Sequence, residues 1–280
     1  MRGLEDVVRA RGLTALRPLA GGLEFETWTA VDPSGGVVVL RASAGGRFRS
    51  NANDPDVDTR ALLRREERIV RHVAAAGLPL AEPVALVLGE PDVLISRYVP
   101  DDGGGADQVG LGALLARLHR IPAPALTRAV DVLPQRVTRR WHEVAALVPD
   151  LPPVPTGLRR PLVGRPTTSL LHLDVRAPNL RCVDGDVRAL LDWSNALVGD
   201  PALELARLEE FAPLPGNGLD LRAIRAGYGP VPAHESYLVY QLDAAVMLAL
   251  VFLSEAPDET LAAQAVARLR VLADRWAATA

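Results

Sequence analysis

The spacing of apolar residues in the first part of the chain changes from helical to strand-like. Residues 3–13 have the period of a short amphipathic helix. Residues 27–31 and 37–40 are apolar and β-branched, and the turn at 32–36 between them contains Asp, Pro and Gly. This order predicts an antiparallel hairpin. Residues 42–57 are rich in Gly, Asn, Asp and Pro, which predicts a loop.

A longer helix and two further strands follow this hairpin. Residues 58–76 have apolar positions near helical spacing, and Gly77 lies where a C-terminal cap belongs. Residues 84–88 and 93–98 have the composition of strands. The glycine-rich stretch 101–107 then breaks the pattern and is the best candidate for a boundary between two lobes.

Helical spacing dominates beyond this boundary. Residues 109–118 predict a helix, and the stretch 129–148 contains another. Residues 180–183 and 187–191 predict two short strands around a tight turn. An Asp-Pro pair at 200–201 is typical of a helix start, with Asp as the N-cap. The chain therefore has a small strand-rich part followed by a larger helical part.

Composition and charge exclude several classes of function. The 280 residues include no lysine, so all 31 basic residues are arginine, and they face 34 acidic residues for a net charge of −3. A Schiff-base or P-loop lysine is therefore impossible. A basic nucleic-acid groove is not expected, because the chain is slightly acidic. The single cysteine, Cys182, excludes an intramolecular disulfide and an all-cysteine metal site.

Neither the first residues nor the apolar runs indicate a membrane. The first 13 residues contain no apolar core of the kind that secretory signals have. The longest apolar run, 244–253, has ten residues, which is half of the roughly 20 that span a bilayer. We expect a cytoplasmic protein with a buried helix at 244–253 and no membrane partner.

The residues that can carry chemistry cluster between positions 172 and 192. Asp174 and Asn179 lie five residues apart in a polar loop between apolar runs, and Asp192 ends a strand that turns back toward this loop. Two carboxylates and an amide oxygen are hard ligands that suit magnesium, which takes one or two protein ligands beside phosphate and water. A carboxylate that is not a ligand can accept a proton from an attacking hydroxyl. This division of roles is the phosphoryl-transfer template.

The motifs in this region resemble one family. The sequences HLDVRAPN at 172–179, LDW at 191–193 and Gly-Asp-Pro at 199–201 are similar to those of the aminoglycoside phosphotransferase and choline kinase branch of the protein-kinase-like superfamily. Local similarity to macrolide phosphotransferases is present as well. The resemblance implies an α+β, bilobal protein-kinase-like fold. A nucleotide-binding N-lobe with an antiparallel sheet would occupy residues 1–99, and a mainly helical C-lobe residues 100–280.

The resemblance also implies roles in the catalytic loop. Asp174 is the catalytic base that aligns the acceptor hydroxyl. Asn179 and Asp192 hold the magnesium ions. Arg176 contacts the transferring phosphate, where an arginine stabilises the equatorial oxygens. His172 is structural and braces the loop. Asp200 supports the same region, and a helix-cap role fits it better than a ligand role.

A basic residue on the third strand holds the nucleotide phosphates in this superfamily, and a helix glutamate pairs with it. Arg41 ends the strand that starts at residue 37, and an arginine can hold phosphate in a bidentate way. Its expected partner is Glu66, with Glu67 as the alternative. Gly21 and Gly22 occupy the turn that covers the phosphates. Two acidic residues follow at 24 and 26, and we expect both carboxylates to face solvent, because inward carboxylates repel a polyanion.

The stretch 96–99 aligns with the hinge that binds the purine edge through its backbone. Ser96, Arg97 and Val99 are the residues concerned, with the Arg97 carbonyl and the Val99 amide as the expected partners. Since backbone pairing leaves the side chains free to vary, the sequence does not discriminate ATP from GTP.

We expect the helical lobe beyond residue 200 to bind the acceptor. Glu204, Glu209 and Asp243 are candidate groups for a cationic sugar, and the last lies in an otherwise apolar helix. We expect a Mg²⁺-dependent kinase, monomeric or homodimeric, that phosphorylates an aminoglycoside- or macrolide-type antibiotic or a related amino-sugar or amino-alcohol. The alternative is a catalytically degenerate, nucleotide-binding pseudokinase with a regulatory role.

Overall fold

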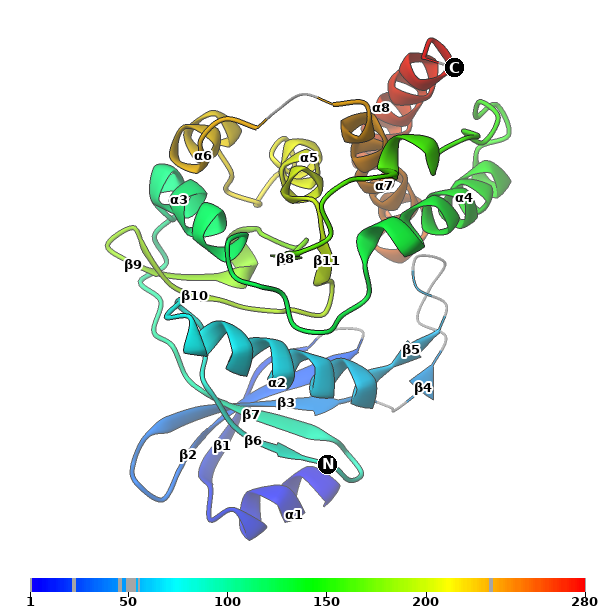
Figure 1. The fold of residues 1–280 in the computed structure, drawn as a ribbon. Helices are drawn as coiled ribbons and strands as arrows, with labels where there is room; N and C mark the ends of the chain where they lie inside the picture. Colours follow the sequence, from blue (N-terminus) through cyan, green and yellow to red (C-terminus); the bar gives the residue numbers. More distant parts are fainter. Residues whose placement is uncertain are drawn as a thin grey trace. The chain divides into compact units, whose positions relative to one another are not determined.

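The computed structural model shows a chain that folds into two compact units (Figure 1). The structure describes residues 2–21, 24–44, 47–48, 54, 56–231 and 234–279. The first unit comprises residues 1–50, 54–107 and 178–195, and the second comprises residues 51–53, 108–177 and 196–280.

A five-stranded antiparallel sheet forms the centre of the first unit. Its strand order is β1 (Thr14–Gly21), β2 (Phe25–Val31), β3 (Val37–Ser43), β7 (Val93–Arg97) and β6 (Pro83–Val87). The predicted hairpin is confirmed as β2 and β3, which pair without a register break from Phe25↔Ser43 to Val31↔Val37.

Two helices cover this sheet, one on each face. Helix α1 (Arg2–Ala10) packs Leu4 against one face, where Val38 and Leu40 are buried. Helix α2 (Thr59–Ala75) packs Leu63 against Phe25 on the other. Figure 1 shows the two helices on opposite sides of the strands. Burial of both faces fixes the strand register, because a slip by one residue would exchange the faces.

Helix α2 begins and ends where the sequence predicts. The Asp58 side chain caps it by accepting from the Ala61 N–H at 2.9 Å, and Gly77 follows its end with a φ of +70°. Glycine takes this left-handed conformation without steric cost. The predicted loop before the helix carries a short strand pair instead, β4 (Arg47–Phe48) with β5 (Val57–Asp58).

A distant hairpin belongs to the first unit as well. Strands β9 (Leu180–Val183) and β10 (Asp186–Leu190) turn at 184–185, where both residues have positive φ. Asp102 fixes this turn, since its N–H donates to the Cys182 carbonyl at 3.0 Å and its carboxylate accepts from the Asp184 N–H at 2.7 Å. The hairpin therefore folds with the sheet-containing unit rather than with its sequence neighbours.

Helices make up most of the second unit. They are α3 (Gln108–Leu118), α4 (Ala129–Leu147), α5 (Pro201–Phe211), α6 (Leu221–Tyr228), α7 (Ser236–Leu250) and α8 (Glu259–Ala277), with 3-10 turns η1 (Arg160–Leu162) and η2 (Ala177–Asn179) and a π turn η3 (Val251–Glu255). A short antiparallel pair, β8 (Ser169–Leu171) with β11 (Leu197–Gly199), leads the chain into and out of the hairpin segment. The predicted helix start is confirmed, since Asp200 caps α5 and Pro201 is its first residue.

The core of the second unit surrounds α7. The stretch Ser236–Glu255 is apolar and long enough to cross a membrane by length and composition. The mean hydropathy of its most apolar 18-residue window is 1.7, but 78% of that window is buried within the fold. The core helix of a globular unit passes the same test. The buried helix predicted for this region is confirmed as far as Leu250.

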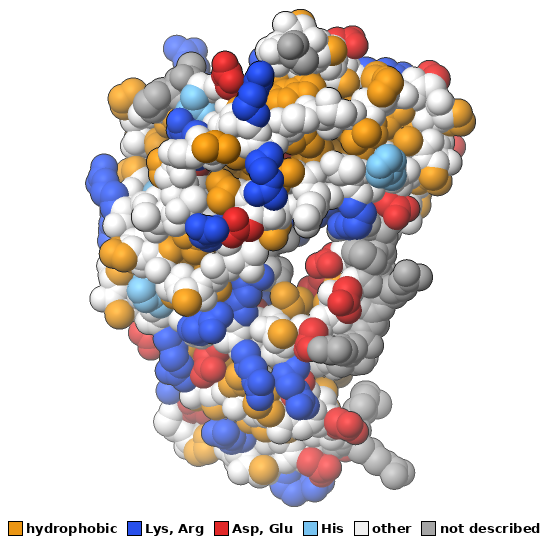
Figure 2. Space-filling view, turned by 45° about the vertical axis from the view of Figure 1, so that its right-hand side comes forward, with side chains coloured by type: hydrophobic (Ala, Val, Ile, Leu, Met, Phe, Trp, Pro, Cys, Tyr) orange, Lys and Arg blue, Asp and Glu red, His pale blue; other side chains and the backbone are white. Residues whose placement is uncertain are grey.

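Figure 2 shows how charge is distributed over one face of the molecule. Arginine side chains lie scattered among acidic and apolar ones on that face.

Candidate active site

Arg41, Glu66 and Asp192 form a charged cluster in the first unit. Arg41 lies in β3 between the buried residues Leu40 and Ala42, and its Nη1 lies 2.5 Å from Glu66 Oε2 on α2. Its Nη2 donates to Asp192 Oδ1 at 3.1 Å. The expected contact between Arg41 and Glu66 is therefore present. The alternative partner, Glu67, instead pairs with Arg71 one turn along the helix.

The surroundings of Arg41 favour the charged form of its guanidinium. The guanidinium lies over the Phe25 ring, with Cζ 4.2 Å from the ring centroid. Burial opposes its charge, but Glu66 and Asp192 more than compensate, so the pKa of Arg41 is raised. Burial raises the pKa of Glu66, and Arg41 offsets only part of this effect. The site therefore has a permanent cation with donors held in place.

Asp192 follows strand β10 and turns one oxygen toward the cluster. Its φ of +62° places it in the left-handed region, which is uncommon outside glycine. Oδ1 accepts from the Ser194 Oγ at 2.7 Å, from the Ser194 N–H at 3.3 Å and from Arg41. Burial acts to raise the pKa of Asp192, but Arg41 and Ser194 outweigh it, so this pKa is lowered. Within the described residues, every donor to this carboxylate binds Oδ1, which leaves Oδ2 as a ligand for a cation.

Asn179 lies beside Asp192 at the open end of the hairpin. It is buried in turn η2, directly before β9, and its backbone carbonyl accepts from the Leu191 N–H at 2.8 Å. The residue that precedes Asp192 is thus tied to Asn179. No group of three or more His, Cys, Asp or Glu residues that could hold a metal occurs in the described part of the chain. An amide and an ionised carboxylate fit magnesium, which needs only one or two protein ligands beside phosphates.

The loop that carries Asp174 lies in the second unit and is held rigidly. His172 is fully buried, and its Nδ1 accepts from the Asp174 N–H at 3.1 Å. Arg176 lies 3.2 Å from Asp174, from Nε to Oδ1, and its side chain is 40% exposed. The carboxylate is therefore oriented by a neighbouring cation that solvent and ligands can still reach.

Glu204 on α5 anchors this loop, a role that the sequence did not suggest. Its Oε2 accepts from the His172 N–H at 2.6 Å, and its Oε1 accepts from the Leu173 N–H at 2.8 Å. Leu173 has a φ of +64°, a conformation that a non-glycine residue keeps only where contacts enforce it. Burial acts to raise the pKa of Glu204, but the His119 imidazole 3.6 Å away and the loop outweigh it, so the pKa is lowered. The only sequence signal is a carboxylate between two leucines in the first turn of α5.

The other two candidate acceptor carboxylates also have protein partners. Asp243 is fully buried, and Arg136 binds both of its oxygens, at 2.8 Å from Nε and 2.6 Å from Nη2. The charges of Arg136 and Arg140 overcome the effect of burial and lower the pKa of Asp243. Glu209 lies 2.7 Å from the Arg225 guanidinium. Their use as contacts for a cationic acceptor stays a prediction.

The turn between β1 and β2 departs from its expected exposure. Gly21 ends β1 with open space around its α-carbon, whereas Gly22 lies outside the described residues. Glu26 faces solvent as expected. The expectation is wrong for Glu24, which is partly buried. The next residue, Phe25, is buried and draws Glu24 toward the cluster. Burial raises the pKa of Glu24, and the nearby negative charge of Asp192 raises it further.

The predicted hinge residues lie at the end of β7. Ser96 pairs with Val39 of β3, and the Arg97 N–H donates to the Glu82 carbonyl at 2.8 Å. The Arg97 side chain pairs with Asp32 in the β2–β3 turn. The chain leaves the sheet after Arg97, so Val99 lies outside the strand. The proposed purine contacts of this segment stay a prediction.

Comparisons with known proteins agree with this arrangement. The model of the phosphotransferase enzyme family matches residues 15–240. No curated protein sequence matches the chain. Among solved structures, a thermostable mutant of aminoglycoside phosphotransferase APH(4)-Ia in a ternary complex with ADP and hygromycin B is similar. Its TM-score is 0.62 at 17% identity, over 96% of each chain.

Two further structures show the same fold. The macrolide 2′-phosphotransferase MphH from Brachybacterium faecium has a TM-score of 0.57 at 19% identity, over 96% of this chain and 97% of that one. The gentamicin–APH(2″)-IIa complex has a TM-score of 0.64 at 15% identity, over 96% of this chain and 95% of that one. The predicted α+β kinase-like fold is thereby confirmed.

Proposed function

Because the chain belongs to the phosphotransferase enzyme family, we propose that it is a Mg²⁺-dependent small-molecule kinase that uses ATP or GTP. The observation that carries this proposal is the Arg41–Glu66–Asp192 cluster, in which Asp192 keeps one oxygen without a donor from the described residues. A fixed cation beside an ionised carboxylate is what a bound triphosphate–magnesium complex needs. The acceptor is a hydroxyl group of a small molecule.

Each residue has a defined task in this reaction. Arg41 binds the α- and β-phosphates, and Glu66 orients its guanidinium. Asn179 and Asp192 hold magnesium, which neutralises charge on the phosphate oxygens when bound. Asp174 accepts the proton of the acceptor hydroxyl as its oxygen attacks the γ-phosphorus, the bond to the bridging oxygen breaks, and the nucleoside diphosphate leaves. Arg176 stabilises the equatorial oxygens, and the Glu204 anchor keeps Asp174 in position.

The proposed acceptor is an aminoglycoside- or macrolide-type antibiotic or a related amino-sugar or amino-alcohol. Support comes from the fold shared with enzymes of both antibiotic classes. Such a kinase would act in the cytoplasm and confer resistance. One observation favours the alternative of a catalytically degenerate pseudokinase. It is Glu24, a partly buried carboxylate near Arg41 and Asp192.

The test measures nucleoside diphosphate release with MgATP and MgGTP against hygromycin B, gentamicin, erythromycin, choline and glucosamine. Acceptor-dependent release, with the phosphorylated product confirmed by mass spectrometry, supports the proposal. Nucleotide binding without transfer to any acceptor supports the pseudokinase. A chain that binds no magnesium nucleotide contradicts both.

Replacement of Arg41 separates the need for positive charge from the need for a guanidinium. Arg41→Ala is expected to weaken nucleotide binding by roughly tenfold or more, since a charge-assisted contact to phosphate is lost. Arg41→Lys should retain much of the affinity, because it keeps the charge. The measurement is calorimetric titration with the magnesium nucleotide. The control is Arg64→Ala, at an exposed position of the same helix as Glu66. An equal loss of nucleotide affinity in that variant would contradict the assignment of Arg41 to the phosphates.

Replacement of Glu24 tests whether its carboxylate opposes the nucleotide. Glu24→Gln is expected to lower KM for the nucleotide roughly fivefold at pH 8, because one negative charge near the phosphates is removed. The raised pKa of Glu24 means that the wild-type side chain gains its proton as the pH falls. The advantage of the variant should therefore shrink toward pH 5. Glu26→Gln, at the exposed position of the same segment, should change nothing, and a gain there would contradict the argument.

A further inference from the structure

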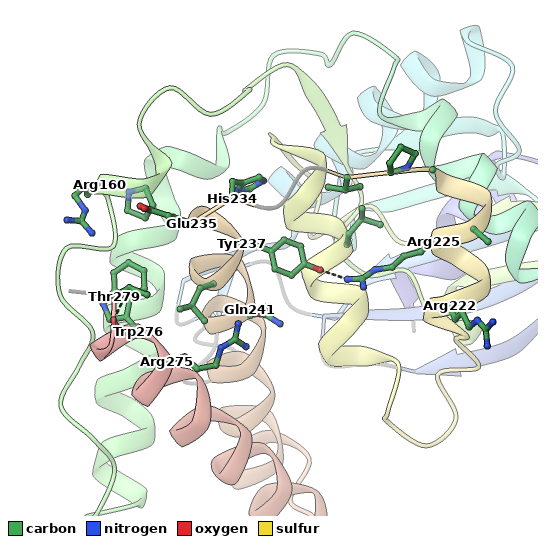
Figure 3. A pocket seen from close by; sticks show the side chains of 17 residues that line it. Arg160, Arg222, Arg225, His234, Glu235, Tyr237, Gln241, Arg275, Trp276 and Thr279 are labelled. Carbon is green, nitrogen blue, oxygen red and sulfur yellow. Dashed lines mark hydrogen bonds between the residues drawn. The ribbon is translucent and has the colours of Figure 1, made fainter.

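One hollow lies entirely within the second unit. Helices α5, α6, α7 and α8 and turn η1 line it (Figure 3). Its volume is about 900 Å³, which is the size of a cavity for a small organic molecule. No residue of the loop 172–179 is among those that line it. It is therefore separate from the proposed catalytic site.

The walls of this hollow are apolar and ordered. Leu205 and Leu238 are buried side chains of α5 and α7 that reach it, and Trp276 of α8 is 8% exposed. The Trp276 indole is fixed, because its Nε1–H donates to the Thr156 carbonyl at 3.0 Å. Apolar side chains of this kind within a pocket bind molecules that bring an apolar body.

The polar groups between α5, α6 and α7 largely satisfy one another. The Tyr237 hydroxyl donates to Glu209 Oε2 at 2.9 Å, and Arg225 donates to the same oxygen at 2.7 Å. Gln241 donates to Glu209 Oε1 at 2.9 Å. The charge of Glu209 is thus taken up by Arg225, and this network forms a polar edge of the hollow. Figure 3 shows one of its contacts, from Arg225 to the Tyr237 hydroxyl.

The remaining charges at the hollow are mainly positive. Beside Arg225, which pairs with Glu209, three arginines line it, Arg160, Arg222 and Arg275, against the single carboxylate of Glu235. Figure 3 shows Arg275 extending toward Gln241, whereas Arg160 and Arg222 point outward. Within the part of the chain that the structure describes, Arg275 has no ion pair. An exposed guanidinium beside an apolar cavity favours an anion and repels a cationic amino-sugar.

We propose that this hollow is a binding site for a small organic anion, an aromatic or aliphatic body that carries a single acidic group such as a carboxylate. The apolar body packs against Leu205, Leu238 and Trp276, and the acidic group binds Arg275. A nucleotide fits poorly, because its several phosphate charges need more donors than the one arginine that extends into the hollow. The site is independent of the proposed kinase reaction.

The experiment uses 8-anilinonaphthalene-1-sulfonate as the probe and N-phenyl-1-naphthylamine as its counterpart without the acidic group. Binding to the 280-residue protein is followed by the fluorescence of the probe, excited directly. Arg275→Gln is expected to weaken binding of the sulfonate by about tenfold and to leave the neutral probe unaffected. Ala226→Trp, which adds bulk at an exposed lining position of α6, should weaken both probes. Ala263→Trp, at an exposed position of α8 outside the hollow, should weaken neither.

Three outcomes would overturn the proposal. Sulfonate binding that is unchanged in Ala226→Trp places the probe elsewhere. An unchanged affinity in Arg275→Gln shows that the site does not recognise an anion. A dimer in light scattering that Ala226→Trp dissociates identifies the occupant as a second copy of this chain. A protein without kinase activity leaves all three readouts intact, so the two proposals can fail separately.

Discussion

The Asp174→Asn variant is expected to lose about 10³-fold in kcat while its KM for the nucleotide changes by less than about threefold. Asparagine has the shape of aspartate, and the backbone N–H at this position still donates to His172. The loop and its Glu204 anchor therefore remain. What disappears is the group that accepts the hydroxyl proton, so the loss falls on the chemical step.

A second aspartate provides a matched control for this variant. Asp186 pairs with Arg188 at 3.2 Å, with the same two-residue spacing and the same distance as Asp174 and Arg176. Asp186→Asn removes an ion pair of the same spacing and distance whose carboxylate is exposed rather than buried, and it should leave kcat unchanged. Steady-state rates with a responsive acceptor from the panel give the comparison. Turnover that survives in Asp174→Asn rules out Asp174 as the base.

Much of the fold could be predicted from sequence because its signals are local. The β2–β3 hairpin, the start of α2 at Asp58 and the start of α5 at Asp200 depend on turn and cap chemistry within a few residues. The pair of β8 with β11 was missed, because each strand has only three residues and its partner lies over 20 positions away. Pairing at that distance leaves no periodic signal.

The candidate site also has parts that could be predicted from the sequence and parts that could not. The pair of Arg41 with Glu66 was expected, because the chain resembles a family in which a basic residue of the third strand pairs with a helix glutamate. The role of Glu204 was not, because its partners are backbone N–H groups in a loop over 30 residues earlier in the chain. The exposure of Glu24 was also misjudged. Its burial follows from tertiary packing of Phe25, which local sequence does not determine.

The Asp192→Asn variant is expected to lose roughly 10²-fold in kcat and to need about tenfold more magnesium for half-maximal rate. The amide keeps an acceptor where Oδ1 now binds Ser194 and Arg41. It removes the charge from Oδ2, the oxygen that has no donor among the described residues. Magnesium titrations of turnover at saturating nucleotide measure both effects. Ser194→Ala removes the hydroxyl donor to Oδ1 and leaves Oδ2 unchanged, so its magnesium requirement should stay within about threefold of the wild type.

Stability against pH gives a readout of Asp192 that does not depend on activity. Its pKa is lowered in the folded protein, so its carboxylate stabilises the fold above the pKa of the unfolded chain, about 3.9. That stabilisation is lost as the pH falls through the lower pKa of the folded state. Urea midpoints from pH 6 to pH 3 should therefore fall less steeply in Asp192→Asn than in the wild type. If the two proteins lose stability in parallel as the pH falls, the ion pair of Asp192 with Arg41 is contradicted. If the variant has the flatter slope but needs no more magnesium than the wild type, the ion pair stands and Asp192 is rejected as the metal ligand.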